Sequence, residues 1–92
     1  MSNPKYRLLY APAALKQLQK LDLSVADSIT SKLEQLTNSD QPLLSAKSLR
    51  GELAGKYRYR IGNYRAIFSI DADGVITLLT ILDIKYRKDI YK

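Results

Sequence analysis

The residues of this sequence most suited to chemistry are a group of cations in its second half. Between positions 47 and 65 there is one acid, Glu52, against six basic residues: Lys47, Arg50, Lys56, Arg58, Arg60 and Arg65. Of the net charge of +6, residues 1–46 carry +1 and residues 47–92 carry +5. Guanidinium and ammonium groups that share a surface attract a polyanion such as a nucleic-acid backbone. The alternative is a solvated basic surface that keeps the protein soluble, and charge alone does not decide between them.

Composition excludes several other chemistries. The chain has no cysteine and no histidine. Disulfides, thiolate nucleophiles and histidine acid–base catalysis are therefore excluded, and the usual zinc ligands are missing. Asp71 and Asp73 share a short turn with Gly74, where acids most often form the turn itself. No other carboxylates cluster in the sequence, so we expect neither a metal site nor a cofactor.

A strand predicted at residues 56–61 alternates strictly. Its even positions are basic, so the cations share one face, and the other face has Tyr57, Tyr59 and Ile61. The following Gly62-Asn63 predicts a two-residue hairpin loop, which places Arg60 opposite Arg65. Like charges directly across a sheet are destabilising by several tenths of a kcal/mol. We infer that these arginines stay together to bind a phosphate; the alternative is neutralisation from within, by Asp83 or the C-terminal carboxylate.

The seven tyrosines are divided between core and surface. Tyr57 and Tyr59 lie on the apolar face of their strand, and we expect them to pack beneath the helices. Tyr91 follows Arg87 and Lys88 at the polar C-terminal end, where nothing apolar requires its burial. Aromatic rings beside cations stack on unpaired RNA bases, and Tyr91 is the tyrosine best placed to do so.

A first helix is predicted at about residues 13–21. Pro12 suits its first turn, and the stripe that we expect in the core consists of Leu15, Leu18 and Leu21.

A second helix is predicted from Ser24 to about Asn38. Asp27, three residues after Ser24, makes this start similar to a capping box. Its apolar stripe, also expected in the core, consists of Val25, Ile29, Leu33 and Leu36.

The rest of the chain has the period of a β-sheet. We predict one strand at residues 6–10, a loop at 43–55, and three further strands at 56–61, 64–70 and 75–82. The order β-α-α-β-β-β indicates an α+β fold in which a two-helix hairpin packs on one face of a small antiparallel sheet. Residues 1–92 are expected to form one domain, because so short a chain has room for a single core.

No segment predicts export or membrane insertion. The N-terminus lacks the apolar run of a signal peptide, and the longest apolar stretch, residues 75–82, is too short to span a bilayer. We expect a soluble, cytoplasmic protein.

Three groups of residues together resemble the pattern of the RelE toxins, within the RelE/ParE superfamily of type II toxin–antitoxin systems. Leu49-Arg50-Gly51 is similar to a Leu-x-Gly turn, and residues 57–65 are similar to a Tyr-Arg-x-Arg-x-Gly-x-Tyr-Arg hairpin. Arg87 and Tyr91 are similar to a basic tail that ends in tyrosine. The resemblance covers nearly the whole chain, and the hairpin motif is fairly specific for the superfamily.

The resemblance implies a RelE-like fold and a toxin that a cognate antitoxin holds inactive. It also implies a ribosome-dependent endoribonuclease that cuts messenger RNA in the ribosomal A site. In that reaction the ribose 2′-hydroxyl attacks the adjacent phosphate, without histidine, metal or cofactor.

The resemblance further implies catalytic roles. Arg58 and Arg60 would bind and polarise the scissile phosphate, and Arg65 would stabilise the charge that grows on the phosphorane. Lys85 or Arg87 would neutralise or protonate the leaving 5′-oxygen. The surrounding cations would bind RNA: Lys47, Arg50, Lys56 and Lys88.

One departure from the family pattern concerns the general base. Some members have lysines where this chain has Arg58 and Arg60, and arginine stays protonated. The base is then Lys85 or Tyr91, or the enzyme acts mainly by orienting the RNA and stabilising charge. Tyr91 would otherwise stack on a base of the codon.

Two other functions fit the same fold. A ParE-like inhibitor of DNA gyrase needs no catalytic constellation, but the intact basic positions on both strands and the C-terminal tyrosine favour the endoribonuclease. A non-catalytic RNA-binding module is the third hypothesis, because positions 58 and 60 lack lysine.

Overall fold

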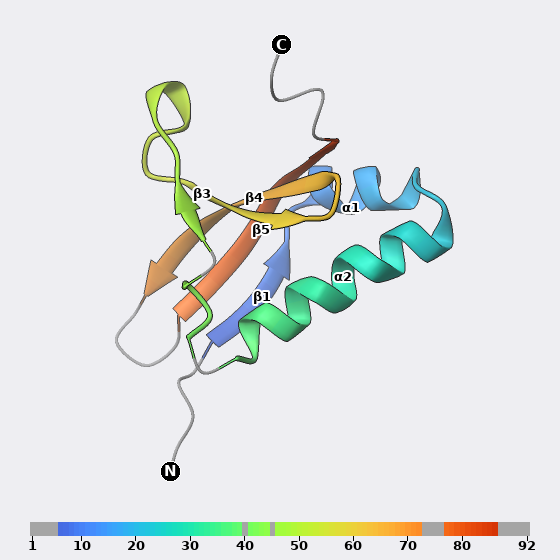
Figure 1. Cartoon of the computed structure of the whole chain (residues 1–92). Helices are drawn as coiled ribbons and strands as arrows, with labels where there is room; N and C mark the ends of the chain where they lie inside the picture. The colour runs from blue at the N-terminus through green and yellow to red at the C-terminus, as the bar shows by residue number, and fades with distance from the viewer. Residues whose placement is uncertain (1–5, 40, 45, 73–76, 87–92) are drawn as a thin grey trace.

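The structure, a computed structural model, describes residues 6–39, 41–44, 46–72 and 77–86. Its elements along the chain are β1 (Tyr6–Tyr10), α1 (Pro12–Gln19), α2 (Leu23–Thr37), β2 (Lys47–Ser48), a 3-10 helix (Gly51–Leu53), β3 (Tyr57–Ile61), β4 (Tyr64–Ala72) and β5 (Thr77–Tyr86). The five strands form one sheet in the order β1-β5-β4-β3-β2 (Figure 1). The prediction of an α+β fold, with two helices on a mostly antiparallel sheet, is confirmed.

β1 is the exception to antiparallel pairing. It runs parallel to β5, from Tyr6 opposite Thr77 to Tyr10 opposite Ile81. The prediction of a purely antiparallel sheet is wrong at this edge, because the period of a segment identifies a strand but not the strand beside it. A second difference lies at β2, which pairs with β3 inside a segment that was predicted to be a loop.

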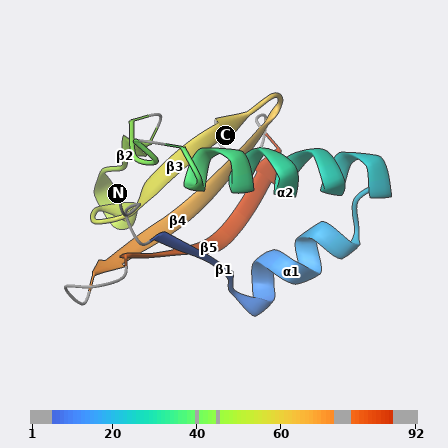
Figure 2. The ribbon, with the colours of Figure 1, turned by 90° about the horizontal axis from the view of Figure 1, so that it is seen from below.

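The two helices lie over different parts of the sheet (Figure 2). α2 crosses one face, where Ile29 and Leu33 are 1% and 0% exposed and belong to the same core as Phe68. α1 contacts mainly β5. Within the described ranges, neither helix is long and apolar enough to cross a membrane.

The stripe of α1 and the start of α2 differ from the prediction, whereas the predicted stripe of α2 is confirmed: Val25, Ile29, Leu33 and Leu36 lie in the core or pack against it. Leu15 is 45% exposed, whereas Ala14 and Leu18 are buried. Residues four apart lie on one side of a helix, whereas a strict spacing of three drifts around it, so Leu15 turns away from the core. Ser24 lies inside α2 and is not its cap: the helix begins after Asp22, whose carbonyl accepts a hydrogen bond from the Ala26 N–H at 2.9 Å.

The centre of the core is built from aromatic side chains of β3 and β4. Tyr59 and Phe68 are both 0% exposed, and their rings stack with centroids 4.5 Å apart. The Tyr59 hydroxyl donates a hydrogen bond to the Pro42 carbonyl. Tyr57 is half-buried and packs against the same Phe68 ring at 5.9 Å. The expectation that Tyr57 and Tyr59 pack beneath the helices is confirmed.

We expect the fold to lose stability in strong alkali because of Tyr59. Burial raises the pKa of its hydroxyl from 10.0 to about 12, so the folded state holds this proton more tightly than the unfolded chain. The contribution of the protonated Tyr59 hydroxyl to the free energy of unfolding is on the order of 2 kcal/mol. It is fully present below about pH 10 and is lost as the pH rises through 12. Urea unfolding at pH 8 and about pH 11 should reveal a fall in the free energy of unfolding. A Tyr59→Phe variant should lose less over that range, and an equal loss would exclude Tyr59 as its source.

A β-bulge divides β5 into two halves. Phe68 of β4 lies opposite Ile81, but the next residue back, Ile67, lies opposite Asp83, so Leu82 is an extra residue in β5. Ile81 and Ile84 are consequently both buried, at 0% and 6% exposure. In a regular strand, residues three apart face opposite sides of the sheet. The bulge therefore reverses which side chains of β5 face α2 after Leu82.

Candidate nucleic-acid interface

The register of the sheet places three cations in a line across neighbouring strands. Arg60 of β3 lies opposite Arg65 of β4, and Arg65 lies opposite Lys85 of β5. We call these three residues the cation row. Directly opposed residues have Cβ atoms roughly 5 Å apart. The predicted pairing of Arg60 with Arg65 is confirmed, and Lys85 extends it to a third strand.

A neighbouring row on the same face carries further charge. Lys47 lies opposite Arg58, Arg58 opposite Ile67, and Ile67 opposite Asp83. This face is the one opposite to Tyr59 and Ile61, whose side chains pack in the core, and we call it the basic face. The structure thus brings together four of the six predicted catalytic residues, Arg58 and the cation row.

The members of this cluster differ in exposure. Arg60 is exposed and Arg58 is half-buried, whereas Arg65, in the middle of the cation row, is 5% exposed. Arg58 and Arg65 each interact with another group of the protein. Arg65 therefore offers little surface to a ligand, and its positive charge acts on the basic face mainly through space. The direct contact with a phosphate that was predicted for Arg65 remains a prediction.

The charges in the cation row repel one another appreciably. Like charges on directly opposed residues destabilise a sheet by several tenths of a kcal/mol. Arg65 has a cationic residue directly opposite on each neighbouring strand. An anion above the row removes this cost, so the arrangement favours occupation by a phosphate group.

Asp83 supplies part of the internal neutralisation that was considered as an alternative. Its Oδ2 lies 3.3 Å from the Lys85 Nζ, and its Oδ1 accepts a hydrogen bond from the Gln17 side-chain amide. The Lys85 and Asp83 side chains are 43% and 30% exposed, so this ion pair contributes little to stability. At this end of the basic face, and among the described residues, one carboxylate stands against Lys85, Arg65, Arg60 and Arg58, which leaves a net positive charge there.

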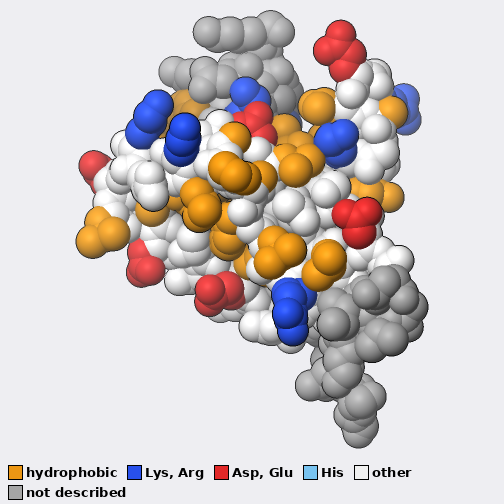
Figure 3. Space-filling model, turned by 180° about the vertical axis from the view of Figure 1, so that it is seen from behind, with side chains coloured by type: hydrophobic (Ala, Val, Ile, Leu, Met, Phe, Trp, Pro, Cys, Tyr) orange, Lys and Arg blue, Asp and Glu red, His pale blue; other side chains and the backbone are white. Residues whose placement is uncertain are grey.

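A cavity of about 360 Å³ adjoins these residues. Its charged lining is Asp83 and Lys85 of β5 together with Lys56, which was predicted to bind RNA. The apolar part of the lining consists of Ala13, Leu53, Ile67 and Leu82. Figure 3, which shows the side of the molecule turned away in Figure 1, has hydrophobic side chains across its middle and Lys and Arg side chains in separate places around them.

The other predicted site residues are spread more widely. Lys47 and Arg50 are exposed; Lys47 lies in β2, and Arg50 precedes the 3-10 helix. Arg87, Lys88 and Tyr91 lie outside the described residues. In the part of the chain that the structure describes, no group of three or more acids, cysteines or histidines could hold a metal ion.

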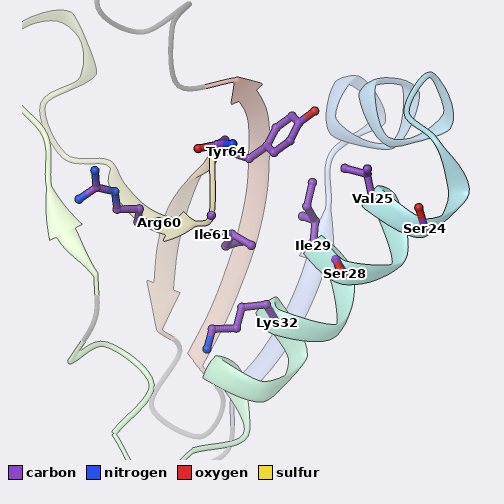
Figure 4. Close-up of a pocket in the computed structure, with 10 residues that line it drawn as sticks. Ser24, Val25, Ser28, Ile29, Lys32, Arg60, Ile61 and Tyr64 are labelled. Carbon is purple, nitrogen blue, oxygen red and sulfur yellow. The ribbon is translucent and has the colours of Figure 1, made fainter.

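A second, larger groove lies on the opposite side of the hairpin. It measures about 550 Å³ and runs between α2 and the β3–β4 turn. Figure 4 shows Ile61 and Tyr64 pointing toward Val25 and Ile29 of α2, whereas the Arg60 side chain points the other way. Arg60 also lines the groove, so the groove and the cation row adjoin at this residue, although its side chain is directed away from α2.

The turn that joins β3 and β4 fixes this division of faces. Gly62, the first residue of the two-residue loop, has φ +58°, and in the described ranges positive φ occurs only at glycine. A positive φ at the first loop position matches the right-handed twist of a hairpin and is favoured by glycine. The closing pair, Ile61 opposite Tyr64, then sets Arg60 against Arg65 on the basic face.

Gln17 is the site neighbour that the sequence did not indicate. It lies on α1, 66 residues before Asp83, and its position in the helix carries no motif. The sequence does contain an indication of the bulge. Ile81 and Ile84 are both apolar, but residues three apart cannot face the same side of a regular strand.

Phosphate is expected to stabilise the fold through the cation row. Phosphate ions at tens of millimolar should raise the free energy of unfolding by about 1 kcal/mol, or the Tm by roughly 5 °C, relative to chloride at equal ionic strength. Thermal unfolding followed by circular dichroism measures this shift. An Arg60→Gln variant should lose most of it, and an Arg7→Gln variant on β1 should retain it. Equal shifts in both variants would contradict an anion site at the row.

Comparison with proteins of known sequence finds a toxin among the relatives. The chain is 43% identical over 54 residues to Toxin RelG of Mycobacterium tuberculosis, which is 59% of this chain and 60% of RelG. The match thus spans less than two thirds of that relative.

Solved structures match over more of the chain. The toxin–antitoxin complex RelBE2 of Mycobacterium tuberculosis contains a chain that is 26% identical, with a TM-score of 0.71 over 94% of this chain and 95% of the other. The RelB–RelE antitoxin–toxin complex of Methanococcus jannaschii contains one that is 27% identical, with a TM-score of 0.57 over 90% and 94%.

The match to a family also covers most of the chain. The family described as "ParE toxin of type II toxin-antitoxin system, parDE" matches residues 8–91. That range includes every described helix and strand from α1 onward and all but the first two residues of β1. This chain therefore belongs to the ParE toxin family of type II toxin–antitoxin systems, within the RelE/ParE superfamily.

Proposed function

We propose that this toxin is a ribosome-dependent endoribonuclease that cleaves messenger RNA in the ribosomal A site. The observation that carries the proposal is the cation row: Arg60, Arg65 and Lys85 are set side by side on three strands. Such a row suits a reaction in which negative charge accumulates on one phosphate, because fixed positive charges stabilise the phosphorane more than the ground state.

The reaction is an attack of the ribose 2′-hydroxyl on the adjacent phosphate. The 2′-oxygen forms a bond to phosphorus, the bond to the 5′-oxygen breaks, and the products are a 2′,3′-cyclic phosphate and a free 5′-hydroxyl. Arg58 and Arg60 are proposed to hold the non-bridging oxygens. Lys85 or Arg87 is proposed to neutralise or protonate the leaving 5′-oxygen, Arg87 alone if Lys85 is the base, and Arg65 adds positive charge.

The general base is not one of the buried tyrosines. Burial raises the pKa of both Tyr10 and Tyr59 to about 12, so neither loses its proton at neutral pH. Arginine stays protonated as well. Lys85 and Tyr91 remain the proposed bases, or the ribosome supplies the RNA geometry and the toxin mainly stabilises charge.

A cognate antitoxin and the ribosome with messenger in its A site are the proposed partners. Two of the similar solved structures are complexes of a toxin with an antitoxin. We propose that this chain is likewise held inactive by an antitoxin in the cytoplasm. Growth arrest on induction of the toxin, relieved by co-induction of the neighbouring antitoxin gene, is the expected result. Unrelieved arrest would contradict this pairing.

The decisive experiment uses purified toxin in a reconstituted translation reaction. Primer extension should map cuts inside codons at the A site, and naked messenger in parallel should stay uncut. An Arg60→Gln protein should cut much more slowly, and Arg7→Gln serves as the matched control because Arg7 is exposed on the β1 edge. Intact messenger with continuing translation would exclude the endoribonuclease.

A second candidate function is inhibition of DNA gyrase in the manner of ParE-type toxins. The observation that favours it is the description of the matching family, which refers to ParE. A supercoiling assay with purified gyrase tests it, and inhibition there together with intact messenger would assign the chain to that class. Tight RNA binding without cleavage in translating extract would instead support the non-catalytic module.

A further inference from the structure

The β-bulge in β5 decides whether Lys85 reaches the basic face. If β5 were regular after Ile81, Asp83 and Lys85 would face α2 and Ile84 would face the opposite side. The extra residue, Leu82, reverses this order. Lys85 joins Arg60 and Arg65 only because the bulge is present.

Among the residues that the structure describes, no strand pairs with the outer side of the bulged part of β5. β1 ends its pairing at Tyr10, opposite Ile81, and the chain then turns into α1. The last backbone bond of this edge is donated by the Ala11 N–H to the Ile81 carbonyl, at 2.8 Å. An unpaired backbone N–H in a partly buried position is costly, so the edge after Ile81 needs another partner.

Gln17 of α1 supplies that partner. Its Oε1 accepts a hydrogen bond from the Ile84 N–H at 2.7 Å, and its Nε2 donates one to the Asp83 Oδ1. One amide thus completes the backbone ladder and holds the Asp83 carboxylate, which pairs with Lys85 at 3.3 Å. The two bonds fix the orientation of the amide, because a backbone N–H requires an acceptor and a carboxylate requires a donor.

We propose that Gln17 is a positioning residue of the toxin. Its amide holds the segment of β5 after Leu82 in the orientation that directs the Lys85 side chain to the basic face. It acts through Asp83 and Ile84 and does not itself touch the RNA. This inference rests on the proposed endoribonuclease function, but the placement of Lys85 is also measurable without it.

Cleavage kinetics on programmed ribosomes test the role directly. A Gln17→Leu variant removes both hydrogen bonds and should lower kcat roughly 10- to 100-fold, with KM for the ribosome changed little, because misplacement of one group impairs the chemical step. Gln19→Leu is the matched control, since Gln19 is exposed on the same helix. Equal kcat values for the two variants would overturn the proposal.

A Gln17→Glu variant separates the two hydrogen bonds. It keeps an acceptor for the Ile84 N–H but places a second carboxylate against Asp83, in a cluster whose other charged groups are Lys85 and Lys56. Two adjacent carboxylates share a proton more readily as the pH falls. Activity relative to wild type should therefore be low at about pH 8 and recover at about pH 5.5. A relative activity independent of pH would contradict the role of the Asp83 bond.

The phosphate shift in Tm separates this inference from the proposed function. Gln17→Leu carries no change in charge, so it should lose phosphate stabilisation only if Lys85 leaves the basic face. If wild type cuts no messenger, but Gln17→Leu loses the phosphate shift and Gln19→Leu retains it, the endoribonuclease proposal fails and the positioning role stands. If Gln17→Leu retains the full shift, the positioning role fails. Should Gln17→Leu not fold, Gln17→Glu provides the same comparison at pH 5.5 and 8.

Discussion

Replacement of Arg65 by methionine is expected to reduce messenger cleavage by a factor of roughly 100 to 1,000 while the protein remains folded. Arg65 is the centre of the cation row, with Arg60 and Lys85 directly opposite on either side. Loss of one preorganised positive group from an oxyanion-type site typically costs this much in kcat. Methionine matches the length of the arginine stem and fills a position that is 5% exposed, so no large cavity forms.

The stability of the same variant distinguishes catalysis from folding. Arg65→Met removes the like-charge repulsion on both neighbours as well as the interaction that Arg65 makes within the protein. We expect the free energy of unfolding in urea to stay within about 2 kcal/mol of wild type. Arg7→Met is the control for loss of a cation elsewhere and should cleave at the parental rate. Parental cleavage by Arg65→Met itself would remove Arg65 from the mechanism.

The hairpin of the basic face was predictable from sequence because its determinants are local. Alternation of tyrosine and arginine over residues 57–60 gives the two faces, and Gly62-Asn63 gives the loop length. Loop length sets the register, and the register sets Arg60 opposite Arg65. No long-range information is needed for any of these steps.

The remaining half of the cation row depends on contacts that are distant in sequence. Lys85 reaches it through a bulge opposite Ile67 and through a side chain of α1, 67 residues before Ile84. The apolar run predicts that the last strand ends at Leu82, whereas β5 continues to Tyr86. The difference arises because the bulge interrupts the alternation of apolar residues at Leu82. The parallel pairing of β1 with β5 was missed for the same reason, since pairing partners are set by the whole sheet and not by the strand.

The burial of Arg65 could not be predicted from the alternation of residues in its strand. Arg65 lies on the central strand of the cation row, and 5% of the residue is exposed. A strand pattern indicates which face a residue is on but not how deeply its neighbours bury it. Because the three cations lie on adjacent strands and act on one phosphate in the proposed reaction, we expect single substitutions within the row to have non-additive effects on cleavage.

Deletion of Leu82 is expected to leave the protein folded, with Lys85 still beside Arg65. Leu82 is the extra residue of the bulge, so without it the next three residues can follow Ile81 in a regular ladder, opposite the same residues of β4 as before. Ile84 then stays in the core, and Asp83 and Lys85 stay on the basic face.

The cost of the deletion should be that of one partly buried leucine and a local adjustment of β5, on the order of 1–3 kcal/mol. Leu82→Ala is the matched control, because it keeps the bulge and should cost about 1–2 kcal/mol. Circular dichroism and urea unfolding of both proteins measure the difference. A deletion protein that does not fold would show that β5 requires the bulge itself and not only the faces on which its side chains lie.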